Sequence, residues 1–135
     1  MRAEQPGTPV FRPTLLVVDD EPLVADFVTE ILEPEGFNII AADSADAALS
    51  LLEKEDANID ILLTDIRMPG SMDGAQLANL VCQRWADMPI IVMSGYETPS
   101  TASIKCKVRF LPKPWSIGQL IDAVNGVAYS VTPSA

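Results

Sequence analysis

The sequence predicts a single α/β domain, built as a doubly wound, five-stranded parallel sheet with helices on both faces. Two observations predict it. Short apolar runs alternate along the chain with segments whose apolar residues recur at helical spacing, which is typical of βαβ units. The length of 135 residues and the hydrophobic content of 48 % suit one domain with one sizeable core.

Five apolar runs are the predicted strands. The first run is continuously apolar up to its acidic end, as a strand covered on both faces requires. Each run lies between turn-forming residues or a predicted helix, which sets its length. The predicted strands are residues 15–19, 37–42, 59–64, 89–93 and 108–111.

The predicted helices have recognisable starts. Pro22 suits a first helical position, and Ser44 and Asp73 are candidate N-caps. Ser116 and Gln119 have the spacing of a capping box. Helical spacing predicts one inward-facing stripe on each helix. The predicted inward residues are Leu23, Val24, Phe27, Val28, Ile31 and Leu32; Ala48, Leu51 and Leu52; Leu77, Leu80, Val81 and Trp85; and Ile117, Leu120, Ile121, Val124 and Val127.

Three stretches fit this pattern less well. Residues 1–13 carry three prolines and few core candidates, so we expect a mostly disordered tail before a domain at 14–129. Residues 130–135 form a polar C-terminal tail. The segment from Thr98 to Ser103 is rich in weak helix formers where the fourth helix should lie, which predicts a short or frayed helix.

Composition excludes several classes of function. The net charge of −10 argues against direct binding to a nucleic-acid backbone, and no apolar stretch is long enough to span a membrane. The absence of histidine excludes catalytic sites of the Ser-His-Asp and Cys-His types, histidine-ligated zinc, and a phosphohistidine carrier. Cys82 and Cys106 match no metal-ligand spacing, so we expect a reduced pair of thiols in the cytoplasm.

Polar residues gather at the ends of the predicted strands. Asp19 and Asp20 end the first, Asp65 follows the third, Ser94 follows the fourth and Lys113 follows the fifth. The carboxyl ends of parallel strands meet at one edge of a sheet, where ligands bind in such folds. Two carboxylates about 4 Å apart repel by roughly 4 kcal/mol at an effective dielectric near 20. A hard divalent cation such as Mg²⁺ would relieve that repulsion.

Each of these residues also has a plainer explanation. Asp19 or Asp20 alone could be a solvated helix N-cap, and Asp65 alone could begin a turn. Ser94 could lie in an ordinary loop and Lys113 on an ordinary surface. The convergence of all of them at strand ends favours a site, because the plainer explanation needs a separate coincidence for each strand.

Four stretches in order resemble the receiver domain of bacterial two-component response regulators, and they span about residues 14–128. The resemblance implies a flavodoxin-like sheet with strand order 2-1-3-4-5. It places Asp19, Asp20 and Asp65 where the strand order reverses. The matching stretches are Leu16-Val17-Val18-Asp19-Asp20-Glu21, Asp65-Ile66-Arg67-Met68-Pro69-Gly70 with Asp73-Gly74, Val92-Met93-Ser94-Gly95, and Leu111-Pro112-Lys113-Pro114.

The resemblance implies a role for each matching position. Asp65 corresponds to the phosphoacceptor. Asp19 and Asp20 correspond to the acidic Mg²⁺ pocket, with Asp20 as the more direct ligand, and the backbone carbonyl of Arg67 as another. Mn²⁺ could replace Mg²⁺. Lys113 would bind the phosphoryl group, and in this family the peptide bond to the following proline is often cis.

Two further positions carry the switch in this resemblance. Ser94 would bond a phosphoryl oxygen after Asp65 is modified, and Phe110 matches an aromatic that changes rotamer; its plainer role is in the core. Tyr96 and Arg67 flank the site at positions that tune hydrolysis in the family. Ser71 is one extra residue in the loop after Asp65. The stretch from Ser94 to Lys113, which in the family contributes to a common output or dimerisation face, is shorter than usual.

We therefore expect a single-domain, cytoplasmic phosphoprotein of a phosphorelay. Its donor would be a histidine kinase or a histidine phosphotransfer protein. It would contact a downstream protein target or act as a phosphate sink, and a weak or phosphorylation-dependent homodimer is compatible with it. It would catalyse only its own phosphorylation and dephosphorylation.

Two alternatives are from other classes. One is a constitutive binding module with a receiver fold and no phosphorylation. The other is a true enzyme, such as an aspartate-based phosphatase or a flavin protein. Against the enzyme, no Asp-x-Asp arrangement follows the first strand, and no glycine-rich phosphate loop is present.

Overall fold

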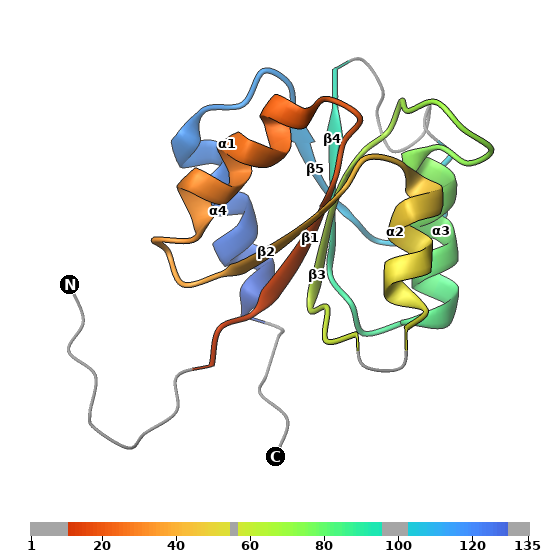
Figure 1. Ribbon diagram of the computed structural model, residues 1–135, viewed down its shortest axis with the longest axis horizontal. Coiled ribbons are helices and arrows are strands. Elements are labelled where there is room, and N and C mark those ends of the chain that lie inside the picture. Colours follow the sequence, from red (N-terminus) through yellow and green to blue (C-terminus); the bar gives the residue numbers. More distant parts are fainter. Residues whose placement is uncertain (1–10, 55–56, 96–102, 130–135) are drawn as a thin grey trace.

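The computed structural model describes residues 11–54, 57–95 and 103–129, which form five strands and four helices (Figure 1). Strands and helices alternate except between β4 and β5. Residues 1–10 of the predicted tail at 1–13, and the predicted tail at 130–135, lie outside the described residues. Arg12 and Pro13 are described, and they are hydrogen-bonded to Phe37 and Asn38 at the start of β2. The elements are β1 (Thr14–Val18), α1 (Pro22–Leu32), β2 (Asn38–Ala42), α2 (Ala45–Leu52), β3 (Ile61–Asp65), α3 (Gly74–Arg84), β4 (Ile90–Ser94), β5 (Arg109–Pro112) and α4 (Ile117–Ala128).

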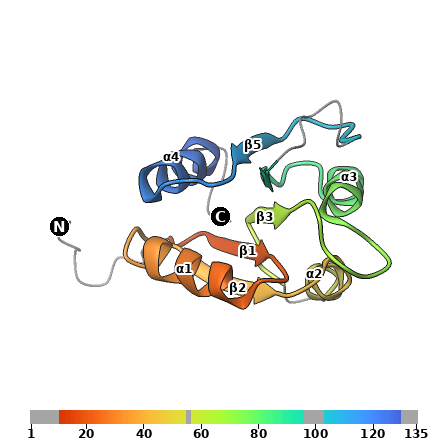
Figure 2. The same cartoon turned by 90° about the horizontal axis from the view of Figure 1, so that it is seen from above.

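The sheet is parallel throughout and has the order β2-β1-β3-β4-β5, which confirms the predicted fold class and strand order. Helices α1 and α4 cover one face, and α2 and α3 cover the other (Figure 2). Alternate residues of β1 supply the two cores. Leu15 and Val17 pack towards α1 and α4, whereas Leu16 and Val18 pack towards α2 and α3.

The predicted helix starts are confirmed. The Ser44 hydroxyl accepts a hydrogen bond from the Ala47 N–H and caps α2. Asp73 with Gln76, and Ser116 with Gln119, form reciprocal capping boxes at α3 and α4. Each cap satisfies amide groups that the first turn leaves without a helical partner. The caps therefore fix where the loops from β3 and β5 end.

Three residues predicted to face the core do not. Leu23 is 70 % exposed, Phe27 is 56 % exposed and Ile117 is 56 % exposed. On α1 the fully buried line runs through Val28 and Leu32. Leu23 and Phe27 lie one position earlier on the helix, rotated by about 100° from that line. Helical periodicity identified an apolar stripe that is wider than the part the sheet covers.

The connection from β4 to β5 also differs from the prediction. Residues 96–102, which hold Tyr96 and most of the predicted fourth helix, lie outside the described residues. The described residues 103–108 that follow contain no helix. Within this segment Cys106 forms a disulfide with Cys82 of α3, contrary to the expected pair of reduced thiols.

The start of α3 packs directly against the end of β3. The Gly74 N–H donates to the Ile66 carbonyl over 2.8 Å. A Cβ atom at Gly74 would overlap the backbone carbonyl oxygen of Asp65. Only glycine allows the helix to begin this close to the strand. The first turn of α3 thus fixes the backbone that carries Asp65.

Replacing Gly74 tests this contact. We expect Gly74→Ala to lower the free energy of unfolding by about 1–3 kcal/mol, because the new methyl group forces the Asp65 carbonyl to move. The matched control is Gly118→Ala in the first turn of α4, where an added Cβ would meet only the Ser116 hydroxyl at 3.9 Å. That variant should be neutral or more stable by up to about 1 kcal/mol. Equal losses of stability in urea unfolding would contradict this account of Gly74.

Candidate functional site

The sheet brings the predicted polar residues to one edge. Asp19 directly follows β1, Asp65 ends β3 and Ser94 ends β4. Lys113 directly follows β5. Because β1, β3, β4 and β5 are parallel neighbours, their carboxyl ends lie side by side. The convergence inferred from the sequence is therefore present in the fold.

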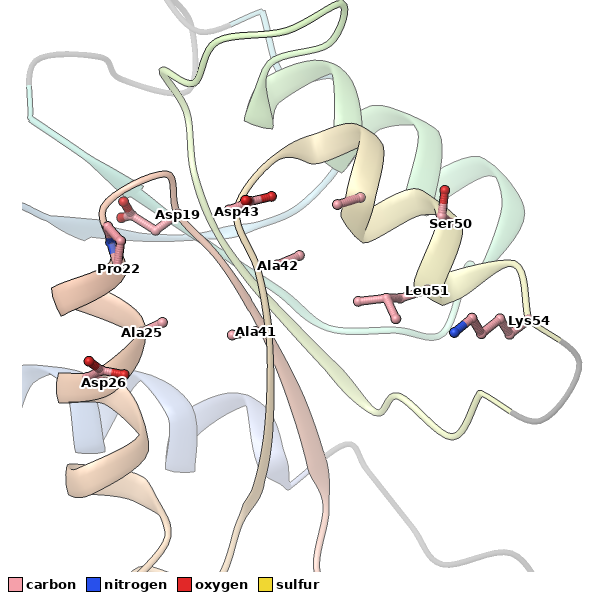
Figure 3. A pocket seen from close by; sticks show the side chains of 11 residues that line it. Asp19, Pro22, Ala25, Asp26, Ala41, Ala42, Asp43, Ser50, Leu51 and Lys54 are labelled. Carbon is pink, nitrogen blue, oxygen red and sulfur yellow. The ribbon is translucent and has the colours of Figure 1, made fainter.

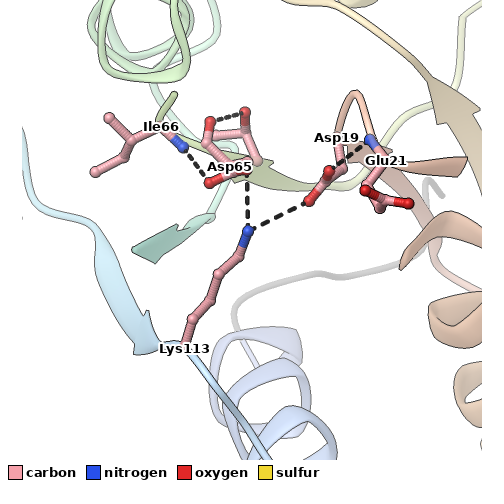
Figure 4. A network of polar contacts seen from close by, with 6 residues as sticks. Asp19, Glu21, Asp65, Ile66 and Lys113 are labelled. Carbon is pink, nitrogen blue, oxygen red and sulfur yellow. Dashed lines mark hydrogen bonds and ion pairs between the residues drawn. The ribbon is translucent and has the colours of Figure 1, made fainter. Parts of the chain in front are cut away.

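Both oxygens of the Asp65 carboxylate have a defined partner (Figure 4). Oδ1 accepts a hydrogen bond from the Ile66 N–H over 2.8 Å, and Oδ2 lies 3.0 Å from Nζ of Lys113. The backbone carbonyl of Asp65 accepts from the Thr64 hydroxyl over 2.8 Å. These contacts fix the rotation of the carboxylate without burying it, because Asp65 keeps part of its surface exposed.

Asp19 is the buried member of the cluster, with 3 % of its surface exposed. Oδ1 accepts from the Glu21 N–H over 2.8 Å, and Oδ2 lies 3.7 Å from Lys113 Nζ. Among the described residues, Oδ2 has no hydrogen-bond partner. Burial raises the pKa of Asp19, and the neighbouring carboxylates of Asp65 and Asp20 add to the rise. The Glu21 N–H and the Lys113 charge act in the opposite direction but do not outweigh burial.

Lys113 stands between the two carboxylates (Figure 4). Burial alone would lower the pKa of its ammonium group, but the hydrogen bond and charge of Asp65, together with Asp19, raise it above the usual value. The side chain therefore stays cationic. Its backbone N–H donates to the Ser94 carbonyl over 2.8 Å, so the end of β5 is tied to the end of β4. The Lys113–Pro114 peptide bond is cis, as the resemblance implied.

The carboxylates fit a hard divalent cation. One carboxylate oxygen from each of Asp19, Asp20 and Asp65 lies within 4.8 Å of the others. Oxygen ligands of this kind are those Mg²⁺ prefers, with water completing its shell. The buried Asp19 Oδ2, which has no hydrogen-bond donor in the described part of the chain, has the free electron pairs that a cation needs. Asp19, Asp20 and Asp65 are the residues that would hold Mg²⁺.

A groove leads along the sheet edge to Asp19 (Figure 3). It has a volume of about 680 Å³ and runs over β2 between α1 and α2. The carboxylates of Asp19, Asp26 and Asp43 line it, together with the ammonium group of Lys54 and mostly apolar side chains such as Ala41 and Ala42. The excess of carboxylates over the single lysine favours the approach of cations.

The structure places the remaining predicted residues around the cluster. Ser94 is buried at the end of β4. Phe110 of β5 is half-buried and packs against the core under α2 and α3, as its plainer explanation requires. Arg67 is exposed in the loop that follows Asp65. The proposed tasks of Ser94, Phe110 and the Arg67 carbonyl remain predictions.

One contact near the site escaped the sequence analysis. Asp46, in the first turn of α2, accepts a hydrogen bond from the Ser71 hydroxyl over 2.7 Å. Gly70 beside it has a φ of 120°, and a Cβ there would meet Asp46 Oδ2 at 3.0 Å. Asp46 thus holds the loop between β3 and α3, which carries Arg67. The extra residue Ser71 was the only signal, because no local pattern in the sequence relates it to Asp46, 25 residues away.

An apolar surface adjoins the charged cluster. A pocket of about 580 Å³ is lined by Val24 and Phe27 of α1 and by Lys113, Pro114 and Trp115 after β5, with Gly95 at its rim. The ammonium group of Lys113 therefore faces the carboxylates, whereas the rest of its side chain lines this pocket. We call Phe27, Trp115 and Leu23 the apolar patch.

Comparison with known proteins identifies the family. The family model of the response regulator receiver domain matches residues 15–125 of this chain. The chain belongs to the response regulator receiver family. The Heme response regulator HssR of Staphylococcus aureus is 34 % identical over 115 residues, which are 83 % of this chain and 50 % of that protein. The two-component response regulator ARR21 of Arabidopsis thaliana is 35 % identical over 106 residues, covering 78 % of this receiver and 17 % of that protein.

Solved receiver structures have the same fold. A response regulator receiver protein from Sinorhizobium medicae superposes with a TM-score of 0.79 at 32 % identity, covering 87 % of this chain and 95 % of that one. The Francisella response regulator 1452 receiver domain gives a TM-score of 0.76 at 27 % identity, covering 87 % and 98 %. The receiver spans half or less of the two curated relatives named above. None of the helices in the described part of the chain could cross a membrane.

Mg²⁺ binding should stabilise the receiver measurably. We expect millimolar Mg²⁺ to raise the melting temperature, because the cation relieves repulsion among Asp19, Asp20 and Asp65. At a concentration 100 times the Kd the gain is about 2.7 kcal/mol. Asp19→Asn should abolish this response, whereas Asp87→Asn, at the opposite end of the sheet, should keep it. A melting temperature indifferent to Mg²⁺ in the unaltered protein would contradict the proposed metal site.

The raised pKa of Asp19 gives this response a pH dependence. The folded state holds the Asp19 proton more tightly than the unfolded chain, whose pKa is near 3.8. Without metal, ionisation of Asp19 therefore lowers stability as the pH rises from 3.8 through the higher folded pKa. Mg²⁺ needs the ionised carboxylate, so its stabilisation should fade on acidification at a pH above 3.8. Melting curves with and without Mg²⁺ across pH 4–7 measure both effects.

Proposed function

We propose that this receiver takes a phosphoryl group from a partner's phosphohistidine onto Asp65, in a Mg²⁺-dependent reaction. The donor is a histidine kinase or a histidine phosphotransfer protein. The observation that carries the proposal is the position of the Asp65 carboxylate, partly exposed at the sheet edge, oriented by the Ile66 N–H and 3.0 Å from the Lys113 ammonium. A nucleophile, a fixed cation and an acidic metal pocket are the parts that phosphoryl transfer requires.

The phosphoryl transfer needs no reactant other than Asp65 and the phosphohistidine of the donor. An oxygen of Asp65 forms a bond to phosphorus while the bond from phosphorus to the donor imidazole breaks. The imidazole nitrogen leaves with the electron pair, and the aspartate becomes an acyl phosphate. Water later attacks the phosphorus and restores the carboxylate. The receiver thus promotes its own phosphorylation and dephosphorylation and turns over no external metabolite.

Lys113 supplies charge stabilisation that is already in place. Its ammonium group lies 3.0 Å from Asp65 and 3.7 Å from Asp19, so it needs little movement to meet a phosphoryl oxygen. Bound Mg²⁺ would neutralise further negative charge on the phosphoryl group. The Ile66 N–H donates a hydrogen bond to one oxygen of the Asp65 carboxylate and so fixes the orientation of the nucleophile.

The response to phosphorylation passes through Ser94 and Phe110 in this proposal. Ser94 is buried at the end of β4, and its carbonyl is bonded to the Lys113 N–H, so movement at either residue affects the other. Phe110 lies on the neighbouring strand and is only half-buried. A new bond from the Ser94 hydroxyl to the phosphoryl group would shift this edge and bias a two-state surface. Output is contact with a downstream protein, or storage of phosphate, in the cytoplasm.

The apolar patch is the proposed docking site for the phosphodonor protein. Phe27 and Leu23 project from α1 with 56 % and 70 % of their surface exposed, and Trp115 follows the residue next to Lys113. Large exposed apolar side chains beside a reaction site are typical of a protein interface. A donor bound there has its phosphorylated side chain next to Lys113 and Asp65.

Phosphorylation of Asp65 is directly measurable. Incubation with acetyl phosphate and Mg²⁺ should add the mass of one phosphoryl group to the intact protein. Asp65→Asn should prevent the addition, because an amide is a poor nucleophile, and Asp87→Asn should not affect it. An unchanged mass, under conditions that load another receiver, would sink the proposal. If partner binding is the same for Asp65→Asn and the phosphorylated protein, the constitutive binding module becomes the better account.

The docking surface makes a separate prediction. Phe27→Ala should slow phosphoryl transfer from a protein donor by about tenfold, because it removes a large contact side chain. Loading by acetyl phosphate should be unchanged, since a small donor needs no docking surface. The matched control is Tyr129→Ala, which alters a side chain 90 % exposed at the opposite end of α4 from Trp115. Equal slowing with both donors would show that Phe27 acts in folding or in the phosphoryl transfer itself and not in docking of the protein donor.

A further inference from the structure

A disulfide joins α3 to the segment that precedes β5. Cys82 of α3 and Cys106 are 24 residues apart, and their Cα atoms lie 6.5 Å from each other, a separation that a disulfide spans. The bond joins α3 to residues 103–108, the described segment that leads into β5. Both cysteines are half-buried, so the bond lies at the surface within reach of a small thiol.

Asn79 fastens the same segment one helical turn earlier on α3. Its side-chain amide donates to the Ser103 carbonyl over 3.1 Å, and its side-chain oxygen accepts from the Lys105 N–H over 2.8 Å. Ser103 has a φ of 60°, a conformation that non-glycine residues adopt only when other contacts hold it. The segment therefore has its own attachment to α3, made of two hydrogen bonds and one disulfide.

Little else holds this segment in place. Ser103, Lys105 and Lys107 are exposed, and only Ile104 and Val108 pack against the core as partly buried apolar side chains. Residues with few buried contacts open locally at small cost in free energy. The disulfide closes a chain loop that contains β4 and Ser94, and it ends just before β5 with Phe110. Whether the bond is closed thus decides how firmly residues 103–108, which lead into β5, are held against α3.

We propose that Cys82 and Cys106 form a reversible thiol–disulfide site, opened by a dithiol reductant, which clasps residues 103–108 to α3. A thiolate of the reductant attacks one sulfur, the Cys82–Cys106 bond breaks and a mixed disulfide forms. The second thiol of the reductant then attacks the mixed disulfide. This attack releases the cysteine and leaves the reductant as a cyclic disulfide. Two electrons and two protons reach the receiver, giving two cysteine thiols. A small disulfide oxidant reverses the reaction.

The compartment favours a reversible bond over a permanent one. Protein disulfides in the cytoplasm, where the receiver is proposed to act, are usually transient and redox-sensing. Both cysteines are only half-buried, which suits exchange better than full burial in the core would. This inference concerns the thiols and residues 103–108 alone, so it can fail while the phosphorylation of Asp65 holds, and the reverse.

Thiol labelling of the native protein tests the chemistry. The full chain is equilibrated in buffers with graded ratios of reduced to oxidised dithiothreitol. Exchange is then quenched, free thiols are alkylated, and the intact mass is measured. We expect two alkyl groups or none on each molecule, because complete reduction of one disulfide frees both thiols together. Two free thiols in every buffer would overturn the proposal, since no bond would form. A bond that stays closed in about 10 mM reduced dithiothreitol would also overturn it, by showing a fixed crosslink resistant to exchange.

Hydrogen exchange tests the clasp. On reduction, amides of residues 103–108, with Lys105 as the reporter, should exchange on the order of tenfold faster, while amides of α2 keep their rates. Cys82→Ala should show the fast rate in both oxidising and reducing buffer, because it cannot form the bond. Identical exchange of residues 103–108 in the oxidised and reduced protein would overturn the claim that the disulfide holds this segment.

Discussion

The ion pair between Lys113 and Asp65, with Asp19 beside it, is the interaction on which the rest of the site depends. A parallel sheet brings the ends of β1 and β3 together, and each end bears a carboxylate. Burial makes ionisation of Asp19 costly, and its Oδ2 finds no hydrogen-bond donor among the described residues. Lys113 offsets part of that charge. The negative charge that Lys113 does not offset would attract a divalent cation, and a phosphoryl group would then bind together with that cation.

The fold holds this cluster by means that lie outside it. Gly74 lets α3 start against the Asp65 carbonyl, and the capping box of Asp73 fixes that start. Asp46 secures the loop after Asp65 through Ser71, and the backbone bond from Lys113 to Ser94 joins β5 to β4. The nucleophile therefore rests on rigid elements, as a preorganised site requires. The segment at 103–108 has few buried contacts, and there a covalent bond to α3 replaces packing.

The sequence was sufficient for the strands, the caps and the convergence of Asp19, Asp65 and Lys113, because these follow from local pattern and from parallel strand order. It was not sufficient where the outcome depends on the area that one element covers on another. Leu23 and Phe27 share the apolar stripe of α1, yet the sheet reaches only its other side. The pairing of Cys82 with Cys106 likewise depends on two elements 24 residues apart, a relation that no local spacing encodes.

The most direct test of phosphorylation at Asp65 is a crystal structure grown with Mn²⁺ and beryllium fluoride, which mimics an acyl phosphate. We expect anomalous density for Mn²⁺ bound by carboxylate oxygens of Asp19 or Asp20 and of Asp65, next to the Arg67 carbonyl. We also expect beryllium on an oxygen of Asp65, with Lys113 against a fluorine. Beryllium on another residue, or Mn²⁺ away from these carboxylates, would contradict these expectations.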